Sequence, residues 1–181
     1  MKINFNQIFS QGLKAHQEGR LKEAEQLYRE ALKAEPKNLY AYNNLGTILQ
    51  QHGKVKEAEK CFKKAIEFKP DYAEAHNNLG IILNNLGKFD EAETSFKKAI
   101  ELKPNYAEAY NNLGILLYEL DRFNETEENY KKAIEFKPDY AEAYYNLGVS
   151  LQEVGRLNEA EKNFSKALKL KPDYAEAYNN L

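Results

Sequence analysis

Apolar residues recur along the chain at spacings of three and four, in runs that glycines interrupt. Between residues 73 and 106, a first run contains Ala75, Leu79, Ile82, Leu83 and Leu86. After Gly87, a second run contains Phe89, Ala92, Phe96, Ala99 and Ile100. Such spacing places the apolar side chains of each run on one face of an α-helix. The pattern therefore predicts two amphipathic helices joined by a tight turn.

The same pattern returns every 34 residues, and a glycine marks the same place in each unit: Gly12, Gly46, Gly80, Gly114 and Gly148. We expect residues 1–181 to form one array of repeats 5–38, 39–72, 73–106, 107–140 and 141–174, with a partial sixth repeat at 175–181. Positions below are counted from the first residue of each repeat. A period of this length is typical of solenoids, in which each unit stacks on its neighbours.

Several residue types keep step with this glycine. Each repeat has alanine at position 27, an aromatic residue at position 24 and a proline near its end, and four of the glycines follow a leucine. These features at a 34-residue period resemble the tetratricopeptide repeat (TPR) family. The resemblance implies an all-α fold, a right-handed α-solenoid of helix-turn-helix repeats.

Four of the turns within repeats carry a glycine that can end a helix in the left-handed conformation: Gly19, Gly53, Gly87 and Gly155. Repeat 4 departs from this pattern, with Asp121 in the turn and Thr126 in place of the usual small alanine, so it is the weakest match. In the turns between repeats, the spacing of Asp71 and Glu74 predicts a side-chain cap at the next helix. The same spacing recurs twice, in the pairs Asp139 and Glu142, and Asp173 and Glu176.

The charge pattern excludes several classes of function. The net charge is −2 and both signs are mixed, so no basic surplus indicates nucleic acid. No apolar run approaches the roughly 20 residues of a membrane span.

The single cysteine, Cys61, forms no internal disulfide and is interpreted as a small residue on a helix face. Glutamates four residues before lysines, such as Glu59 and Lys63, are interpreted as solvent-facing pairs. We expect a soluble, cytoplasmic protein with no membrane or nucleic-acid partner.

Members of the TPR family line a concave groove with their first helices, at positions 2, 5, 6, 9, 12 and 13. This resemblance places two rows of asparagines in the groove, together with tyrosines. The candidate peptide-binding residues are Asn43, Asn44, Asn77, Asn78, Asn111, Asn112, Tyr118, Tyr145 and Asn146. The rows resemble the asparagine ladder of the O-GlcNAc transferase superhelix. Carboxamides both donate and accept, so they can hold the backbone of an extended peptide.

Two interpretations of the ladder stay open, because the asparagines could instead form a solvated helix face, although peptide binding is the favoured one. If the ladder binds peptide, replacing Asn78, Asn112 and Asn146 by alanine should weaken capture and leave melting nearly unchanged. Glutamates at positions 2 and 13 make the inner face neutral to acidic, so a neutral to basic extended partner is expected. The family's chaperone-binding members clamp a carboxylate with lysine and arginine, and those cations are missing here.

No chemistry-bearing motif appears. The three histidines, His16, His52 and His76, fall at unrelated repeat positions, and we expect no metal site, cofactor or enzymatic activity. The chain halts within a first helix, which leads us to expect that the natural protein continues. The favoured function is a protein-interaction scaffold. The alternative is the substrate-recruiting arm of a larger enzyme such as a glycosyltransferase, and self-association through the uncapped C-terminal end is a further possibility.

Overall fold

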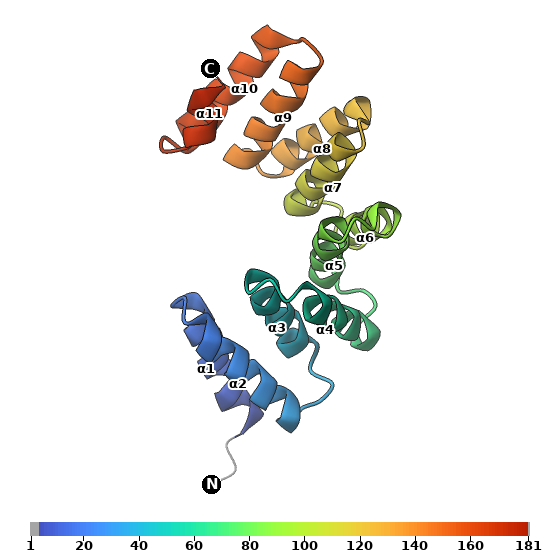
Figure 1. Cartoon of the computed structure of the whole chain (residues 1–181), viewed down its shortest axis with the longest axis vertical. Helices are drawn as coiled ribbons and strands as arrows, with labels where there is room; N and C mark the ends of the chain where they lie inside the picture. The colour runs from blue at the N-terminus through green and yellow to red at the C-terminus, as the bar shows by residue number, and fades with distance from the viewer. Residues whose placement is uncertain (1–3, 181) are drawn as a thin grey trace. The chain divides into compact units, whose positions relative to one another are not determined.

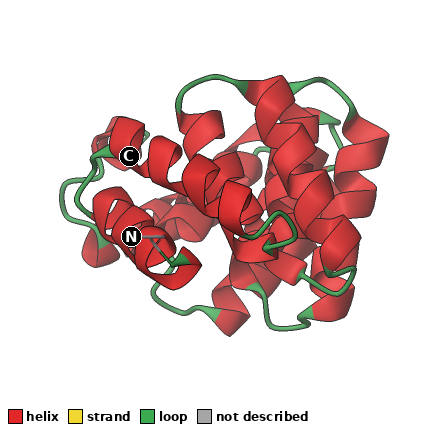
Figure 2. Ribbon diagram, turned by 90° about the horizontal axis from the view of Figure 1, so that it is seen from below, coloured by secondary structure: helices red, strands yellow, loops and turns green. Residues whose placement is uncertain are grey.

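The computed structural model describes residues 4–180 and contains, in that range, eleven α-helices and no strand (Figures 1 and 2). The first helices of the successive pairs are α1 (Phe5–Gln17), α3 (Leu39–Gln51), α5 (Ala73–Asn85), α7 (Ala107–Glu119), α9 (Ala141–Glu153) and the short α11 (Ala175–Asn179). The second helices are α2 (Leu21–Ala34), α4 (Val55–Phe68), α6 (Phe89–Leu102), α8 (Phe123–Phe136) and α10 (Leu157–Leu170). The all-α class predicted from the sequence is confirmed.

The chain divides into two compact units, one up to Ser95 and one from Phe96 onward, with the division inside α6. In the first unit, helices α1 to α5 pack each on the next along the chain. In the second unit, helices α7 to α11 do the same. Burial is therefore spread along each unit instead of gathering in one centre, as expected of stacked repeats.

The two helices of a repeat approach closely because a glycine faces an aromatic ring. A Cβ atom added at Gly46 would lie 2.7 Å from the ring of Phe62, and one added at Gly148 would lie 2.6 Å from Phe164. Both rings are buried, with at most 1% of their surface exposed. No heavier side chain fits at these two glycines without displacing a core ring, which explains why glycine recurs at position 8.

The turns inside the repeats adopt the left-handed conformation predicted for them. Gly53 has φ +70° and Gly155 has φ +78°. Asp121 takes the same conformation with φ +58°, at a steric cost that glycine avoids. Thr126, the second departure of repeat 4, is fully buried, and its Oγ1 donates to the carbonyl of Arg122 at 3.0 Å. Its hydroxyl is thereby satisfied inside the helix.

The caps predicted between the repeats are wrong at the later turns. The N-cap residues of α5, α9 and α11 are Tyr72, Tyr140 and Tyr174, and none makes a side-chain cap bond. The aspartate stands one residue too early to reach the first helical N–H groups. Asn38, which occupies the tyrosine's position in repeat 1, does cap its helix, because its side chain accepts from the N–H of Ala41 at 3.0 Å.

Candidate functional site

The sequence placed the candidate site on the first helices, and we call their side that carries positions 2, 5, 6, 9, 12 and 13 the first-helix face. In the first unit this face belongs to α1, α3 and α5, and in the second unit to α7, α9 and α11. Each unit therefore carries its own portion of the first-helix face.

The asparagines of positions 5 and 6 form hydrogen bonds between successive repeats. In the first unit, Asn78 Nδ2 donates to Asn43 Oδ1 at 3.1 Å. In the second unit, Asn146 Nδ2 donates to Asn111 Oδ1 at the same distance, 3.1 Å. The position 6 side chain of one repeat is thereby fixed by the position 5 side chain of the repeat before it.

The two rows differ in exposure. At position 5, Asn43, Asn77 and Asn111 are buried, with 8%, 4% and 0% of their surface exposed. At position 6, all four asparagines are half-buried: Asn44, Asn78, Asn112 and Asn146. A ligand on the first-helix face could touch the position 6 row, whereas Asn111 lies beneath the surface.

Repeat 1 lacks an asparagine at position 5, and Asn44 turns to another partner. Its side chain hydrogen-bonds to the hydroxyl of Tyr28, a core ring of repeat 1. Burial raises the pKa of Tyr28, and the hydrogen bond with Asn44 offsets part of that increase. Position 6 therefore links successive repeats even where the asparagine pair is absent.

The two candidate tyrosines both belong to the second unit and are half-buried. Tyr145 packs against Tyr174, with ring centroids 5.0 Å apart, and its hydroxyl accepts from Asn180 Nδ2 at 3.1 Å. Tyr118 meets the edge of Phe123 at 5.8 Å. Burial raises the pKa of Tyr118, and the negative charge of Glu153 raises it further. Each of the two rings thus packs against a second aromatic ring.

Glutamates give the second unit's portion of the face its charge. Glu119, Glu142 and Glu153 are exposed there, and Asn111 Nδ2 donates to Glu142 Oε1 at 3.4 Å. Glu108 instead accepts from Lys137 at 2.9 Å. Burial raises the pKa of Glu108, but the hydrogen bonds from Lys137 and from the backbone, together with the charges of Lys137 and Lys103, lower it by more, so the net pKa is lowered.

Ion pairs and hydrogen bonds around Glu25 link successive repeats. Glu25 contacts Lys54 at 3.0 Å, Arg29 at 2.9 Å and His52 at 2.9 Å. Partial burial would raise the pKa of Glu25, but its hydrogen bonds to Lys54, Arg29 and His52 bring it down to about 2. The carboxylate is only 12% exposed, so it belongs to the packing between repeats.

The same bridge recurs elsewhere at a spacing of 29 residues. Glu59 meets Lys88 at 3.2 Å, and Glu127 meets Arg156 at 2.6 Å. The predicted pair between Glu59 and Lys63 is present at 2.7 Å, but its carboxylate is 14% exposed and serves both lysines. The interpretation of such glutamates as solvent-facing is therefore wrong. The recurring 29-residue spacing between acid and base was the signal in the sequence.

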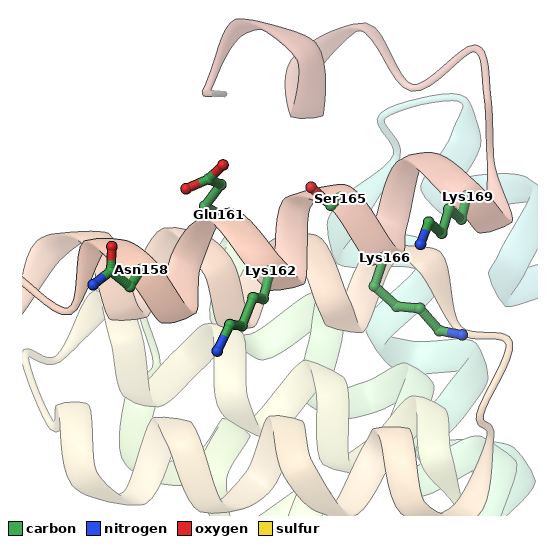
Figure 3. Close-up of a pocket in the computed structure, with 6 residues that line it drawn as sticks. All are labelled: Asn158, Glu161, Lys162, Ser165, Lys166 and Lys169. Carbon is green, nitrogen blue, oxygen red and sulfur yellow. The ribbon is translucent and has the colours of Figure 1, made fainter.

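A pocket on α10 lies apart from these residues. Figure 3 shows its lining side chains, which all come from that second helix: Asn158, Glu161, Lys162, Ser165, Lys166 and Lys169. All of its lining residues are polar or charged types, and none lies on a first helix. It thus has no part in the first-helix face.

Within residues 4–180, no group of three or more histidine, cysteine, aspartate or glutamate side chains is arranged to hold a metal ion. No helix in the described part of the chain has the length and apolar character needed to cross a membrane. Cys61 is buried, and burial raises the pKa of its thiol to about 11.

The recurring helix pairs agree with comparisons to known proteins. Residues 4–181 match the family model described as the C-terminal domain of cilia and flagella-associated protein 70, a TPR domain. The chain belongs to this TPR family. No curated protein matched the chain.

Solved TPR structures resemble the chain along most of its length. The crystal structure of MamA is 30% identical, covers 91% of this chain and 96% of its own, and has a TM-score of 0.75. YrrB, described as a TPR protein with an unusual peptide-binding site, is 24% identical over 96% of this chain and 89% of its own, with a TM-score of 0.70. TTC0263 of Thermus thermophilus, a thermophilic TPR protein, is 23% identical over 97% of this chain and 95% of its own, with a TM-score of 0.81. The last two similarities show the fold alone.

Proposed function

We propose that this TPR array is a protein-interaction module that binds an extended, neutral to basic peptide segment along its first-helix face, without chemistry of its own. The supporting observation is the pairing of a half-buried asparagine at position 6 with a buried one at position 5, seen for Asn78 with Asn43 and for Asn146 with Asn111. YrrB, with the same fold, is described as having a peptide-binding site.

The pairing favours peptide backbone as the ligand. One N–H of the Asn146 carboxamide is used on Asn111, which sets the orientation of the whole group. A carboxamide has a second N–H and an oxygen, the two groups that complement a peptide bond. Because the side chain is already fixed, binding costs less rotamer entropy than it would for a mobile asparagine.

The charge of the second unit favours a basic segment. Glu142 and Glu153 are exposed on its portion of the first-helix face. Complementary charge on the partner would speed association and exclude acidic segments. A substrate-recruiting arm of a larger enzyme, the alternative function, would use the same face and the same class of ligand.

The proposal is tested with three fluorescein-labelled ten-residue peptides that differ in having two lysines, two serines or two glutamates. We expect the lysine peptide to bind tightest and the glutamate peptide weakest in fluorescence polarisation. The double variant Glu142→Gln, Glu153→Gln should weaken lysine-peptide binding about three- to tenfold. Glu161→Gln, which removes an exposed charge from α10, is the matched control and should leave binding unchanged.

Methylating the backbone nitrogens of the same lysine peptide tests the role of the asparagines. Methylation removes N–H donors of the peptide and leaves its charge in place. The affinity should therefore fall if the asparagine carboxamides hydrogen-bond to the peptide backbone. Equal affinity for the methylated peptide would contradict backbone recognition, and an absence of saturable binding by all the peptides would overturn the proposal.

Self-association is a separate part of the proposal. Three large apolar side chains are exposed near the C-terminal end of the described chain: Val154, Leu157 and Tyr178 at 45%, 62% and 59%. Pairing of two copies through these side chains would bury them. Light scattering should then show a mass that rises with concentration and that Leu157→Lys returns to the monomer value. A constant monomer mass in the unaltered protein would exclude this pairing.

A further inference from the structure

The turn between α2 and α3 lacks two large side chains that the later turns between repeats possess. At position 30, Ala34 stands where later repeats have Phe68, Leu102, Phe136 and Leu170. At position 34, Asn38 stands where later repeats have Tyr72, Tyr106, Tyr140 and Tyr174. The first turn therefore has less apolar side-chain volume than the later turns, both at the end of α2 and just before α3.

An open pocket lies at this turn, lined by the chain from Ala34 to Tyr40. Asn38 directs its polar groups into the turn, accepting from the N–H of Ala41 at 3.0 Å and donating to Glu35 Oε2 at 3.2 Å. The apolar parts of the lining are Ala34, Pro36, Leu39 and Tyr40. Their presence makes the pocket suited to an apolar group.

Tyr40 supplies an aromatic wall. Its side chain is 50% exposed and meets the ring of Tyr72 edge-on, with centroids 5.7 Å apart. Tyr40 stands at position 2, so the pocket adjoins the first-helix face of the first unit. A ligand on that face would pass beside it.

The later turns between repeats each hold a tyrosine ring at position 34. Tyr174 packs on Tyr145 of the preceding first helix at 5.0 Å, and Tyr106 is only 9% exposed. A lysine at position 31 covers these tyrosines, with Lys171 Nζ 4.6 Å from the centre of the Tyr174 ring. An aromatic ring between turn and first helix, with a cation beside it, is therefore a packing arrangement of this chain itself.

We infer that the pocket at the first turn receives a tyrosine or phenylalanine side chain of the bound partner, in place of the ring that repeat 1 lacks. At position 31 the first turn has Glu35 where the later turns have lysine. A basic residue next to the partner's aromatic residue would pair with Glu35 and restore the missing cation. The inference rests on the proposed function, because the bound peptide partner supplies that side chain. Binding of an aromatic group in the pocket can still be tested without a peptide.

The first experiment uses amino-acid amides with the ¹⁵N-labelled protein. N-acetyl-phenylalanine amide should shift the backbone resonances of Leu39, Tyr40 and Ala41 in a saturable way, whereas N-acetyl-alanine amide should not. The variant Ala34→Phe, Asn38→Tyr installs the side chains of the later repeats and should abolish these shifts. Asp121→Gly, which restores a repeat residue at a different turn, is the matched control and should keep them.

Two further variants keep the test decisive if the filled double variant does not fold. Ala34→Leu fills part of the pocket, and Tyr40→Ala removes its wall, and both should reduce the shifts. Equal shifts from the alanine and phenylalanine amides, or undiminished shifts in the folded filled variant, would overturn the inference.

Peptides separate this inference from the proposed function. Adding one phenylalanine to the serine peptide, which does not depend on the glutamates of the second unit, should raise its affinity about tenfold in the unaltered protein and leave it unchanged in the filled variant. Peptide binding that phenylalanine does not strengthen would contradict the pocket alone. Shifts from the phenylalanine amide with no binding of any peptide would contradict the proposed function alone.

Discussion

The two units differ in the charge of the side chains that their first helices expose. On α3 of the first unit, the exposed and half-exposed side chains include the uncharged Thr47, Gln50 and Gln51. On α7 and α9 of the second unit, they include Glu119 and Glu153. The coupling between repeats is nevertheless the same in both units, an asparagine pair at 3.1 Å. The comparison shows which positions the fold fixes and which it leaves variable. The buried bonds repeat, while the surface beside them changes its charge.

The two units should also unfold separately, because each repeat stabilises only its neighbours. Phe62→Ala and Phe164→Ala each empty a buried ring site and should cost about 3–5 kcal/mol. Hydrogen exchange should show the first variant losing protection in residues 4–95 and the second in residues 96–180. A uniform loss along the chain in both variants would mean that the units unfold as one.

The asparagine pairs should give the next largest effect. Asn146→Ala leaves the oxygen of Asn111 without its donor, in a residue with no exposed surface, and should cost about 1–3 kcal/mol. Asn78→Ala should cost less, because its partner Asn43 is 8% exposed and water can replace the lost donor. Urea unfolding measures both, and equal losses would show that burial of the acceptor does not set the cost.

These bonds change one expectation drawn from the sequence. Alanine at position 6 was expected to leave melting nearly unchanged, since the asparagines were considered either as ligand contacts or as a solvated helix face. Asn78 and Asn146 also hold the repeats together, so an alanine variant alters stability and binding at once. For that reason the charge variants Glu142→Gln and Glu153→Gln are the cleaner test of binding.

The sequence predicted the fold well because periodic features determine it. The glycine at position 8 and the ring at position 24 reveal their contact through their recurrence, as Gly46 and Phe62 show. The candidate residues also lie on first helices, as the sequence predicted. Their depth was not predictable, because positions 5 and 6 are neighbours in the sequence and only packing decides that Asn111 is buried and Asn112 is half-buried.

The caps and the acidic bridges show why the rest was missed. The spacing of Asp71 and Glu74 fits a capping box, yet Tyr72 takes the N-cap position in the folded turn. Glu59 forms the predicted local pair with Lys63 and also reaches Lys88 of the next repeat. Local rules describe one helix at a time, whereas these side chains act between helices.

Acid should affect the bridges in both units, and most visibly at Glu25. Its pKa is about 2 in the fold against an ordinary value of 4.5, so its stabilisation is complete above pH 4.5 and is lost as the pH falls towards 2. Glu25→Gln should lower stability at pH 7 by about 1–2 kcal/mol and have little effect near pH 2. Urea titrations at both pH values test this. A loss that is equal at pH 7 and pH 2 would exclude the charge as its cause.

The turn of repeat 4 should give the smallest effect and the only gain. Asp121 has φ +58° where Gly53 in the first unit has φ +70°. Asp121→Gly relieves a left-handed conformation that a Cβ atom disfavours, and should raise stability by about 0.5–1 kcal/mol. Gly53→Ala, the matched change in the first unit, should lower stability by a similar amount, since a Cβ there meets no neighbour within 4 Å and only the backbone conformation is penalised. If Asp121→Gly brings no gain in melting temperature, the greater freedom of glycine in the unfolded chain has cancelled the relief, and the departure of repeat 4 from the repeat pattern costs this fold nothing.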